Sequence, residues 1–475
     1  MAQQMKRKKT SLETTDDGNE DEDTQHPQIY AKNSLDRFGD DLYEVLLSYL
    51  SLEDRFRCEC VSKQFQRTVF GSVVDITLSD ELMQRLLNAK RSDVQLLATI
   101  AIKCPKIQCI DCRGIDYGYE ELIPEVLNTF RDNCRHLREI YCDLTSKSAQ
   151  TMPSLGPLVT RIGGINCYTD SEAITHCHRL SQLRIKSFHD ITDYILNTLF
   201  GNNLHKLVLR SHSDRFNDRL SAFVAQNQSL QCLALKSSYF YTSVSVNEMC
   251  GQLSRLTQLR ELTLGLVFRE MDDQMYATLN QSLRTIGVNC KQLKRLSLQL
   301  NSSTKPVLQL SLDSLGVYRH LKRLHITAYA AIDDLLLDPL RHCKRLTHLE
   351  LDLFQMKPNV LKDMHIKCPR LQYLFIGNFF NITRECLSYI SRLPALQTLV
   401  IQCKGINGLS DNDFSDLLSR TITSATLVVM SAAQDEGSDG DSGGLLGPVL
   451  GPLGIPPINL PPVSLSLRKR RSNIN

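Results

Sequence analysis

The sequence predicts an α/β solenoid, a curved stack of similar units with parallel strands on the concave face and helices outside. Leucine supplies 74 of the 475 residues, well above its share in an ordinary globular protein. An apolar pattern also recurs at a nearly fixed interval along most of the chain. Because 42% of the residues are hydrophobic and 23% are charged, a wholly disordered chain is excluded.

Charge and composition divide the chain into four parts. Residues 1–33 carry a basic cluster and then an acidic run, which is typical of a disordered tail. Residues 34–71 have the pattern of a small helical module, and residues 72–430 hold about 12–13 repeat units. Residues 431–475 are first acidic, then rich in Gly and Pro, and finally basic, so we expect a second disordered tail.

The repeated pattern is one apolar residue, two others, an apolar residue, one other and an apolar residue. It reads LRELTL from Leu259 and LKRLSL from Leu293. Alternate residues of a strand face opposite sides, so the apolar residues of each copy must be buried on one side. Clear copies begin at Leu137, Leu180, Leu204, Leu230, Leu259, Leu293, Leu321, Leu346, Leu371 and Leu396, and weaker ones at Val73, Ile107, Val159 and Ile422.

The spacing of the copies resembles that of leucine-rich repeats. The last four clear copies are evenly spaced, and their interval lies within the period of these repeats, roughly 20 to 29 residues. Residues 383–393 have apolar side chains at helical spacing, which predicts a helix between two strands. Two longer intervals, Val73 to Ile107 and Leu259 to Leu293, predict longer helices or loops.

Cysteine marks the same register. Six cysteines stand three residues before the first apolar residue of a unit, which resembles the cysteine-containing class of leucine-rich repeats, in which the thiol packs as a small apolar residue. We expect no signal peptide and therefore free thiols rather than disulfides. The six are Cys104, Cys134, Cys177, Cys290, Cys343 and Cys368.

A metal site is the alternative to core thiols. Cys109 and Cys112 have a zinc-like CxxC spacing, and Cys167 lies close in sequence to His176, Cys177 and His178. In the repeat frame, however, Cys112 faces inward and Cys109 outward, so the pair cannot bind one ion. We expect no metal and no cofactor.

Residues 38–70 predict three short helices with an exposed apolar face. Five apolar residues fall at i, i+3, i+4, i+7 and i+8 of the first helix. Ser51 and Asp54 have the spacing of a capping box, and Ser62 can cap a third helix that carries Phe65 and Val69. So short a segment builds only a small core, so the apolar face predicts a partner. The five are Leu42, Val45, Leu46, Tyr49 and Leu50.

The run DDLYEVLLSYLSLED, followed by Val61, Lys63 and Phe65, resembles the F-box. Phe38 and Gly39 stand where that motif usually has Leu-Pro, and Phe65 replaces a frequent Trp. An F-box before cysteine-containing repeats is similar to the F-box/leucine-rich-repeat family over about residues 34–430. The resemblance implies a non-catalytic receptor subunit of an SCF-type cullin ubiquitin ligase.

In such a receptor the F-box docks on the Skp adaptor and, through it, on a cullin. The repeats would capture a protein for ubiquitination and proteasomal degradation. An alternative is that the apolar residues of the module pack as a cap on the solenoid. The expected adaptor-binding residues are Phe38, Leu42, Val45, Leu46, Leu50, Leu52, Val61 and Phe65.

The outward strand positions predict a basic concave wall. In the four units from Val159 to Lys236 six outward residues are basic and none is acidic. Farther along, the outward positions are no longer mainly basic, since they include His348, Glu350 and Asp352. Our hypothesis is that the wall binds an acidic or phosphorylated substrate segment; a merely solvated basic face is the alternative. The candidate residues are Arg161, Arg184, Lys186, Lys206, Arg210, Lys236, Arg295, Arg323, His325, Tyr373 and Phe375.

A second functional hypothesis is a nuclear repeat scaffold that binds acidic proteins or nucleic acid without a ligase role. The basic clusters Lys6–Lys9 and Arg468–Arg471 suit nuclear import, so we expect a nuclear or cytoplasmic location. The net charge is only +3 and no apolar run is long enough to span a bilayer, so a membrane partner is not expected, and nucleic acid is disfavoured. No catalytic motif occurs, so we expect no intrinsic enzyme activity.

Overall fold

The computed structural model divides into two compact units, Met1–Val73 and Val74–Asn475. The first unit contains the helical module and the second contains the repeats. The structure describes residues 40–86, 95–115, 119–165, 172–185, 204–212, 220–269, 272–302, 312–328, 336–353, 356–379, 383–403, 424–429 and 464–466.

The helical module consists of α1 (Asp40–Ser48), α2 (Leu52–Arg57), the 3₁₀ turn η2 (Cys58–Cys60) and α3 (Lys63–Ser72). The hydroxyl of Ser51 accepts a hydrogen bond from the backbone N–H of Asp54 at 3.1 Å and donates to its carboxylate at 2.8 Å. The hydroxyl of Ser62 accepts from the N–H of Phe65 at 3.1 Å. Both predicted helix starts are therefore confirmed.

The core of the module is small and closed. It consists of Tyr43 and Leu47 from α1 and Phe65 and Val69 from α3. The rings of Tyr43 and Phe65 meet edge to face with centroids 4.5 Å apart, an arrangement that adds to the gain from burial. The face of α1 that turns inward is therefore a different face from the predicted apolar one.

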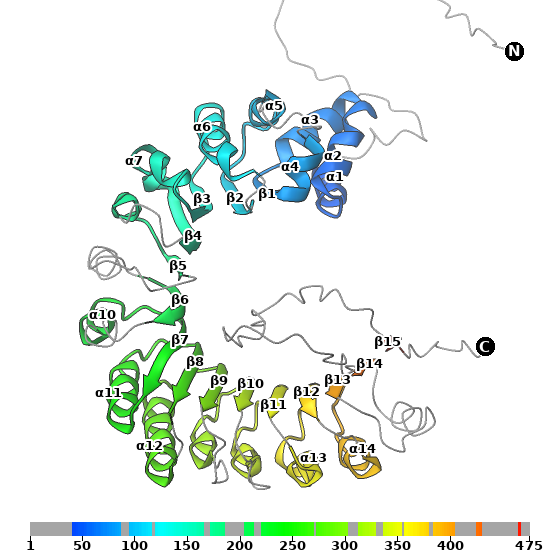
Figure 1. Cartoon of the computed structure of the whole chain (residues 1–475). Helices are drawn as coiled ribbons and strands as arrows, with labels where there is room; N and C mark the ends of the chain where they lie inside the picture. The colour runs from blue at the N-terminus through cyan, green and yellow to red at the C-terminus, as the bar shows by residue number, and fades with distance from the viewer. Residues whose placement is uncertain are drawn as a thin grey trace, which may run out of the picture. The chain divides into compact units, whose positions relative to one another are not determined.

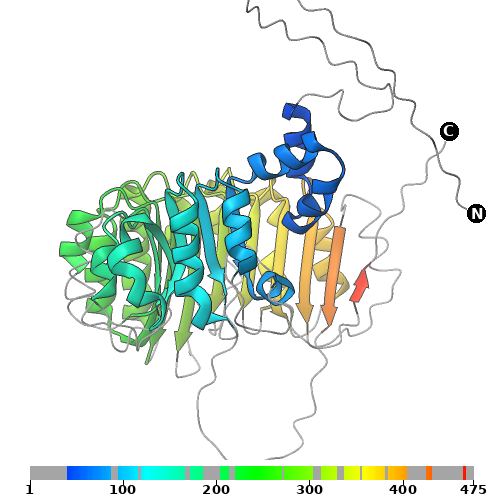
Figure 2. The same cartoon turned by 90° about the horizontal axis from the view of Figure 1, so that it is seen from above.

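The repeats form one sheet in which the strands follow chain order (Figures 1 and 2). Strands β1 to β14 pair in parallel, and helices lie on the outer side of the sheet, so the predicted α/β leucine-rich-repeat solenoid is confirmed. The parallel strands are β1 (Asp75–Ser79), β2 (Cys109–Gly114), β3 (Glu139–Leu144), β4 (Val159–Ile165), β5 (Gln182–Ile185), β6 (Lys206–His212), β7 (Cys232–Tyr241), β8 (Glu261–Phe268), β9 (Arg295–Ser302), β10 (Arg323–Ala328), β11 (His348–Leu353), β12 (Tyr373–Phe379), β13 (Thr398–Cys403) and β14 (Ser424–Val429).

The outer segments include α-helices and 3₁₀ helices. The α-helices are α4 (Asp80–Leu86), α5 (Gln95–Lys103), α6 (Ile123–Asn133), α7 (Met152–Leu155), α10 (Leu220–Gln226), α11 (Ser243–Leu253), α12 (Asp273–Asn289), α13 (Met364–Lys367) and α14 (Arg384–Ile390). The 3₁₀ helices are η3 (Glu120–Leu122), η4 (Ser148–Thr151), η5 (Gly156–Leu158), η6 (Ala173–His176), η7 (Asp313–Val317), η8 (Asp338–His342) and η9 (Pro358–Leu361).

The outer segments differ in length and in kind of helix. The long interval before Leu293 accommodates α12, a helix of 17 residues, as predicted. Several shorter units contain short 3₁₀ turns such as η8 and η9, each of which has a proline in its first two positions. The predicted helix in residues 383–393 is confirmed as α14, which begins at the cap Thr383.

The apolar residues of the repeat make up the core of the solenoid. Leu262 and Leu264 are buried and lie beside Leu296 and Leu298 of the next strand. Burial of a leucine side chain contributes about 1.5–3 kcal/mol, so a column of such residues holds successive units together. The inward positions predicted from the pattern are confirmed.

Two details differ from the prediction. The repeat that begins at Val159 places Ile165 at an outward position of its strand, but Ile165 is buried, because a register shift at the end of β3 and β4 pairs it with the inward residue Leu144. Within the predicted C-terminal tail, β15 (Ser464–Ser466) pairs antiparallel with β14. This strand begins just after the Pro-rich stretch, where backbone N–H groups are again free to bond to a sheet edge.

Candidate functional site

The first candidate surface is the α1 stripe, which we define as Leu42, Val45, Leu46, Tyr49 and Leu50. These side chains are 37–84% exposed. Leu42, Val45 and Leu46 lie on α1, whereas the helix ends at Ser48, so Tyr49 and Leu50 belong to the turn that follows it and not to the helix as predicted. Single exposed apolar residues are ordinary, but five so close together are characteristic of an interaction surface. Val61, which follows η2, is also 56% exposed.

The remaining predicted adaptor-binding residues lie elsewhere. Phe65 is only 8% exposed and packs against Tyr43, so it supports α1 from behind and does not belong to the stripe. Leu52 is half-buried at the start of α2. Phe38 lies outside the described residues. The α1 stripe therefore contains only part of the predicted set.

The second candidate surface is the basic stripe, which we define as Arg161, Arg184, Lys206 and Lys236 on β4 to β7. Arg161 pairs in register with Gln182, and Gln182 with Lys206, so Gln182 separates these two cations within one row across the sheet. Arg184 pairs with the uncharged Val208, so the predicted stripe is a group of spaced cations and not a continuous row. All four side chains are half-buried, and β4 to β7 contain no Asp or Glu. Of the other predicted residues, Arg210 belongs to β6 and Lys186 lies outside the described residues.

The N-terminal end of the basic stripe meets an aromatic and acidic cluster. The guanidinium of Arg161 lies 4.1 Å from the centre of the Tyr141 ring, and that of Arg113 lies 5.3 Å from it. Arg113 also forms a salt bridge of 2.6 Å with Asp111. Burial alone would raise the pKa of Asp111, but hydrogen bonds from Arg113 lower it overall. At this end of the basic stripe the concave wall therefore contains an acidic residue that is already paired with a basic one.

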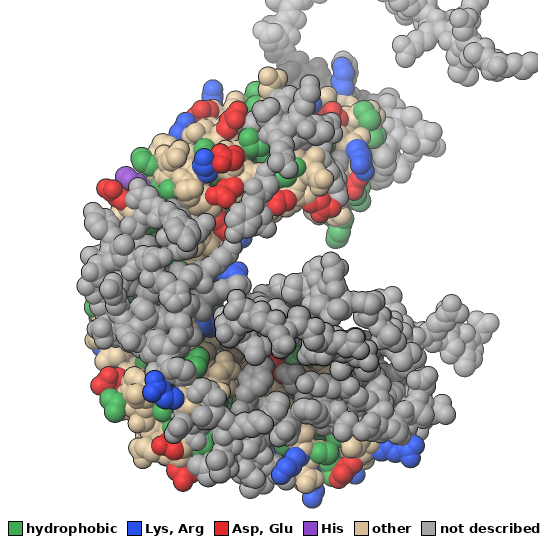
Figure 3. Space-filling model, in the orientation of Figure 1, with side chains coloured by type: hydrophobic (Ala, Val, Ile, Leu, Met, Phe, Trp, Pro, Cys, Tyr) green, Lys and Arg blue, Asp and Glu red, His purple; other side chains and the backbone are tan. Residues whose placement is uncertain are grey.

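Sequence reasoning missed the acids in this part of the wall. Asp75, Asp111, Glu139 and Asp143 occupy β1 to β3, and acidic side chains gather over these repeats in Figure 3. The signal was available, because the weaker repeat copies at Val73 and Ile107 place Asp75 and Asp111 at outward positions. The concave face is therefore divided by charge.

Beyond β7 the wall contains an ion pair and a partly buried histidine. Arg295 pairs with Glu261 at 2.7 Å, and Arg323 lies beside Arg295 in the next strand. The ring nitrogens of His325 lie 3.1 Å and 3.0 Å from the hydroxyls of Ser297 and Thr327. Burial, together with the charge of Lys236, lowers the pKa of His325 to about 4. At neutral pH His325 therefore adds no positive charge to the wall.

The last strands present aromatic and polar groups. The rings of His348 and Tyr373 stack with centroids 5.6 Å apart. Phe375 pairs in register with Glu350, whose pKa is raised by burial although Arg323 opposes the shift. The predicted residues Tyr373 and Phe375 thus lie together at β12, on the far side of Arg323 from the basic stripe.

The cysteines belong to the core. All six residues at the repeated phase are buried, and thiols contact carbonyls of the preceding unit, as Cys290 does with Leu256 at 3.4 Å. Burial raises the pKa of Cys104 and of Cys177 to about 12. The prediction that Cys109 and Cys112 face opposite sides is confirmed by the partial exposure of Cys109 and the full burial of Cys112.

No group of three or more His, Cys, Asp or Glu side chains among the described residues is placed to hold a metal ion. None of the helices in the described ranges has the length and apolar character needed to cross a bilayer.

No family model and no curated protein matches the chain. Among solved structures it is similar to an internalin of Listeria monocytogenes, with 14% identity, coverage of 83% of this chain and 88% of that one, and a TM-score of 0.35. It is also similar to a chain in the complex of Rad7 and Elc1 in yeast, with 16% identity, coverage of 81% and 96%, and a TM-score of 0.44. A leucine-rich-repeat protein of Leptospira interrogans aligns at 16% identity over 74% and 96% of the chains, with a TM-score of 0.29. At these scores the fold class rests on the sheet and repeat geometry described above.

Proposed function

We propose that this protein is the substrate-recognition subunit of an SCF-type cullin ubiquitin ligase, in which α1 to α3 act as an F-box on the Skp adaptor. The observation that carries the proposal is the exposed α1 stripe. The module already has a closed core of its own, built from Tyr43, Leu47, Phe65 and Val69. The stripe is thus apolar surface that the module does not use, and its sequence resembles the F-box.

The stripe is large enough to matter for binding. Full burial of each aliphatic side chain is worth about 1.5–3 kcal/mol, whereas association costs on the order of 4–15 kcal/mol in lost freedom. Binding therefore needs most of the stripe at once. A charge placed at its centre would be left without a partner in the interface, which is costly.

The test uses Leu46→Glu in the full-length chain, with Ser48→Glu as the matched control. Both positions are exposed on α1, but Ser48 is not part of the stripe. Leu46→Glu should abolish co-purification with the Skp adaptor and the cullin, and Ser48→Glu should retain both. Phe65 is unsuitable for this test, because a charge there would disrupt the core of the module.

Other outcomes favour the competing hypotheses. If neither subunit co-purifies with the wild-type chain, the ligase proposal fails and the nuclear scaffold, which the basic stripe also suits, becomes the better explanation. If Leu46→Glu lowers the melting temperature of the repeats and the wild-type chain binds no adaptor, the apolar residues act as a cap on the solenoid.

We propose that the basic stripe binds an acidic or phosphorylated segment of the substrate, since Arg forms bidentate hydrogen bonds with carboxylates and phosphates. Substrates trapped by the Leu46→Glu chain should be lost from the double variant with Arg184→Glu. They should be retained when Lys357→Glu, a change at an exposed residue just before η9, replaces Arg184→Glu. Equal capture by both double variants would remove the basic stripe from the proposal.

No catalytic residue is assigned, because a ligase receptor only positions its substrate. The clusters Lys6–Lys9 and Arg468–Arg471 lie outside the described residues. We propose that they direct nuclear import, which a fluorescent fusion with Lys6, Arg7, Lys8 and Lys9 changed to Ala would test.

A further inference from the structure

Ten similar turns lead from the outer segments into the strands at one edge of the sheet. In nine of them the N–H of the fourth residue donates to the carbonyl of the first, as Leu293 does to Cys290 at 3.1 Å. Figure 2 shows the strands starting along this edge and running the same way. We call these the edge turns: residues 104–108, 134–138, 177–181, 227–231, 256–260, 290–294, 318–322, 343–347, 368–372 and 393–397.

The edge turns carry charge of one sign. They contain twelve Lys and Arg residues and no Asp or Glu, although the whole chain has nearly equal numbers of basic and acidic residues, 55 and 52. All twelve are exposed, and none forms a salt bridge with any residue that the structure describes. They are Lys106, Arg135, Arg138, Arg179, Arg260, Lys291, Lys294, Arg319, Lys322, Lys344, Arg345 and Arg370.

Some of these cations are forced to lie close together. The N–H of Lys294 donates to the carbonyl of Arg260, and that of Lys322 to the carbonyl of Lys294, each at 2.8 Å. Three like charges therefore occupy the same position of successive units, an arrangement that is unfavourable without an anion nearby. A polyanionic surface would relieve this repulsion and attract all three cations.

The helix dipole does not account for the pattern. Cations are favoured near the C-termini of α-helices, and α5, α6 and α12 do end at this edge. Arg319 and Lys344, however, follow η7 and η8, 3₁₀ segments of five residues each whose dipoles are small. The charge follows the edge, whichever kind of helix precedes the turn.

Exposed aliphatic side chains lie on the same edge. Ile102, Val288 and Ile366 each stand two residues before an edge turn, and the carbonyl of Val74 accepts the N–H of Gln108 at the start of β2. These four aliphatic residues are 38–65% exposed. Apart from Val244, they are the exposed large hydrophobic residues in the described part of the repeats. Cations and apolar side chains thus share one edge.

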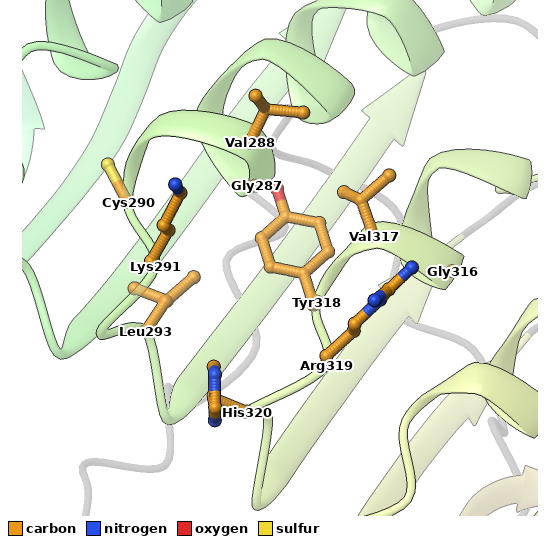
Figure 4. Close-up of a pocket in the computed structure, with 10 residues that line it drawn as sticks. All are labelled: Gly287, Val288, Cys290, Lys291, Leu293, Gly316, Val317, Tyr318, Arg319 and His320. Carbon is orange, nitrogen blue, oxygen red and sulfur yellow. The ribbon is translucent and has the colours of Figure 1, made fainter.

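A pocket of about 420 Å³ opens between two adjacent edge turns. Val288, Val317 and Tyr318 supply its apolar lining, while Lys291 and Arg319 lie on opposite sides of the Tyr318 ring (Figure 4). None of the residues that line it is acidic. The pocket combines an apolar lining with cations, as an anionic amphiphile requires.

We propose that this edge docks on the surface of an anionic lipid bilayer. Lys and Arg side chains would meet the head groups, and the aliphatic side chains would enter the boundary with the acyl chains. Nucleic acid fits less well, because the edge turns present no exposed Phe, Tyr or Trp on which bases would stack: Tyr318 is only 3% exposed. The docking is peripheral and needs no spanning helix.

The size of the effect follows from the charges. Each Lys or Arg near an anionic membrane contributes about 1 kcal/mol, which is about fivefold in affinity. Reversing Lys291 and Arg319 removes two such contributions and adds repulsion. The double variant Lys291→Glu, Arg319→Glu should therefore bind at least about 25-fold more weakly.

The experiment is co-sedimentation of the full-length chain with vesicles of phosphatidylcholine alone or of phosphatidylcholine and phosphatidylserine mixed two to one. We expect binding to the anionic vesicles only, weakened by added salt, and at least about 25-fold weaker for the double variant. The matched control, Lys357→Glu with Lys362→Glu, makes the same change in net charge at two exposed residues away from the edge turns and should bind normally.

Three outcomes would overturn the proposal. The wild-type chain could bind both kinds of vesicle equally, or the edge variant could bind anionic vesicles as well as the control does. Tighter binding of a DNA or RNA duplex than of anionic vesicles at the same salt concentration, lost in the edge variant, would assign the edge to nucleic acid instead. Circular dichroism of both variants would verify that the repeats remain folded.

Discussion

Asn227 shows how a polar residue can replace a core thiol. It stands three residues before Leu230, the phase that cysteine occupies in six other units, and it is fully buried. Its side-chain oxygen accepts from the N–H of Leu204 at 3.0 Å, and its amide donates to the carbonyl of Phe223 at 3.0 Å. The amide therefore joins two consecutive units, a role that the phase alone did not predict.

Asn227→Ala should lower the free energy of unfolding by about 1–3 kcal/mol, because it removes the acceptor of the buried N–H of Leu204, whereas the carbonyl of Phe223 still accepts from the backbone N–H of residue 227. Urea unfolding measures the loss. Gln226→Ala, an exposed change at the end of α10, should stay within about 0.5 kcal/mol of the wild type. Similar losses for the two variants would contradict the bridging role of Asn227.

His325 should make the stability of the repeats depend on pH. Burial lowers its pKa from 6.5 to about 4 in the folded chain, so the unfolded chain binds the proton more readily. The contribution of neutral His325 to the free energy of unfolding is fully present above pH 6.5. It is lost as pH falls toward 4, by up to about 3 kcal/mol. Replacing His325 with Gln should flatten the fall in urea midpoint between pH 7 and pH 4.5, and an unchanged slope would contradict the assignment.

The pattern of the sequence predicted which residues face outward but not how each would behave there. Arg295, for example, was expected to offer a free charge and instead pairs with Glu261. The charge state of His325 depends on burial by neighbouring strands, which no single repeat reveals. Leu42, Val45 and Leu46 of the α1 stripe were predictable because helical spacing alone defines them, but the end of the helix before Tyr49 was not.

At the scale of elements, the sequence predicted caps and strands better than the outer segments. Ser51 and Ser62 cap the expected helices, since a cap depends only on residues three positions apart. The interval between two strands does not separate α-helix from 3₁₀ helix, since the equal intervals from Leu321 to Leu346 and from Leu371 to Leu396 hold η8 and α14 respectively. Segments such as η7 could not be distinguished from short helices by their apolar pattern.

Alanine substitutions at two helical glycines should change the stability of the repeats in opposite directions. A Cβ on Gly287 of α12 would clash with Cγ2 of Val317, whereas a Cβ on Gly251 of α11 meets nothing within 4 Å. Gly287→Ala should destabilise the repeats by about 1–3 kcal/mol through overpacking, in spite of the better helix propensity of alanine. Gly251→Ala should stabilise them by up to about 1 kcal/mol. Thermal melting of both variants compares them directly, and stabilisation by Gly287→Ala would show that η7 moves aside.

At the scale of the whole chain, a net charge of +3 conceals a separation of charge. Acids begin several outer segments, as Asp80, Asp273 and Glu385 do, while the edge turns are basic. A count over the sequence therefore predicted no membrane partner. Only the fold shows that residues one repeat apart in the sequence fall on a common edge.

This separation predicts that salt stabilises the repeats. The cations of Arg260, Lys294 and Lys322 repel one another across neighbouring units, and the screening length falls from about 30 Å at 10 mM salt to about 3 Å at 1 M. Lys294→Gln should therefore raise the free energy of unfolding by about 0.5 kcal/mol at 10 mM NaCl and leave it nearly unchanged at 1 M. Urea unfolding at the two salt concentrations measures both values. Lys357→Gln, which removes an exposed lysine away from the edge turns, supplies the control. A gain for Lys294→Gln that persists at 1 M NaCl would mean that the benefit does not come from relieved repulsion, and the edge would then lack the uncompensated charge on which membrane docking depends.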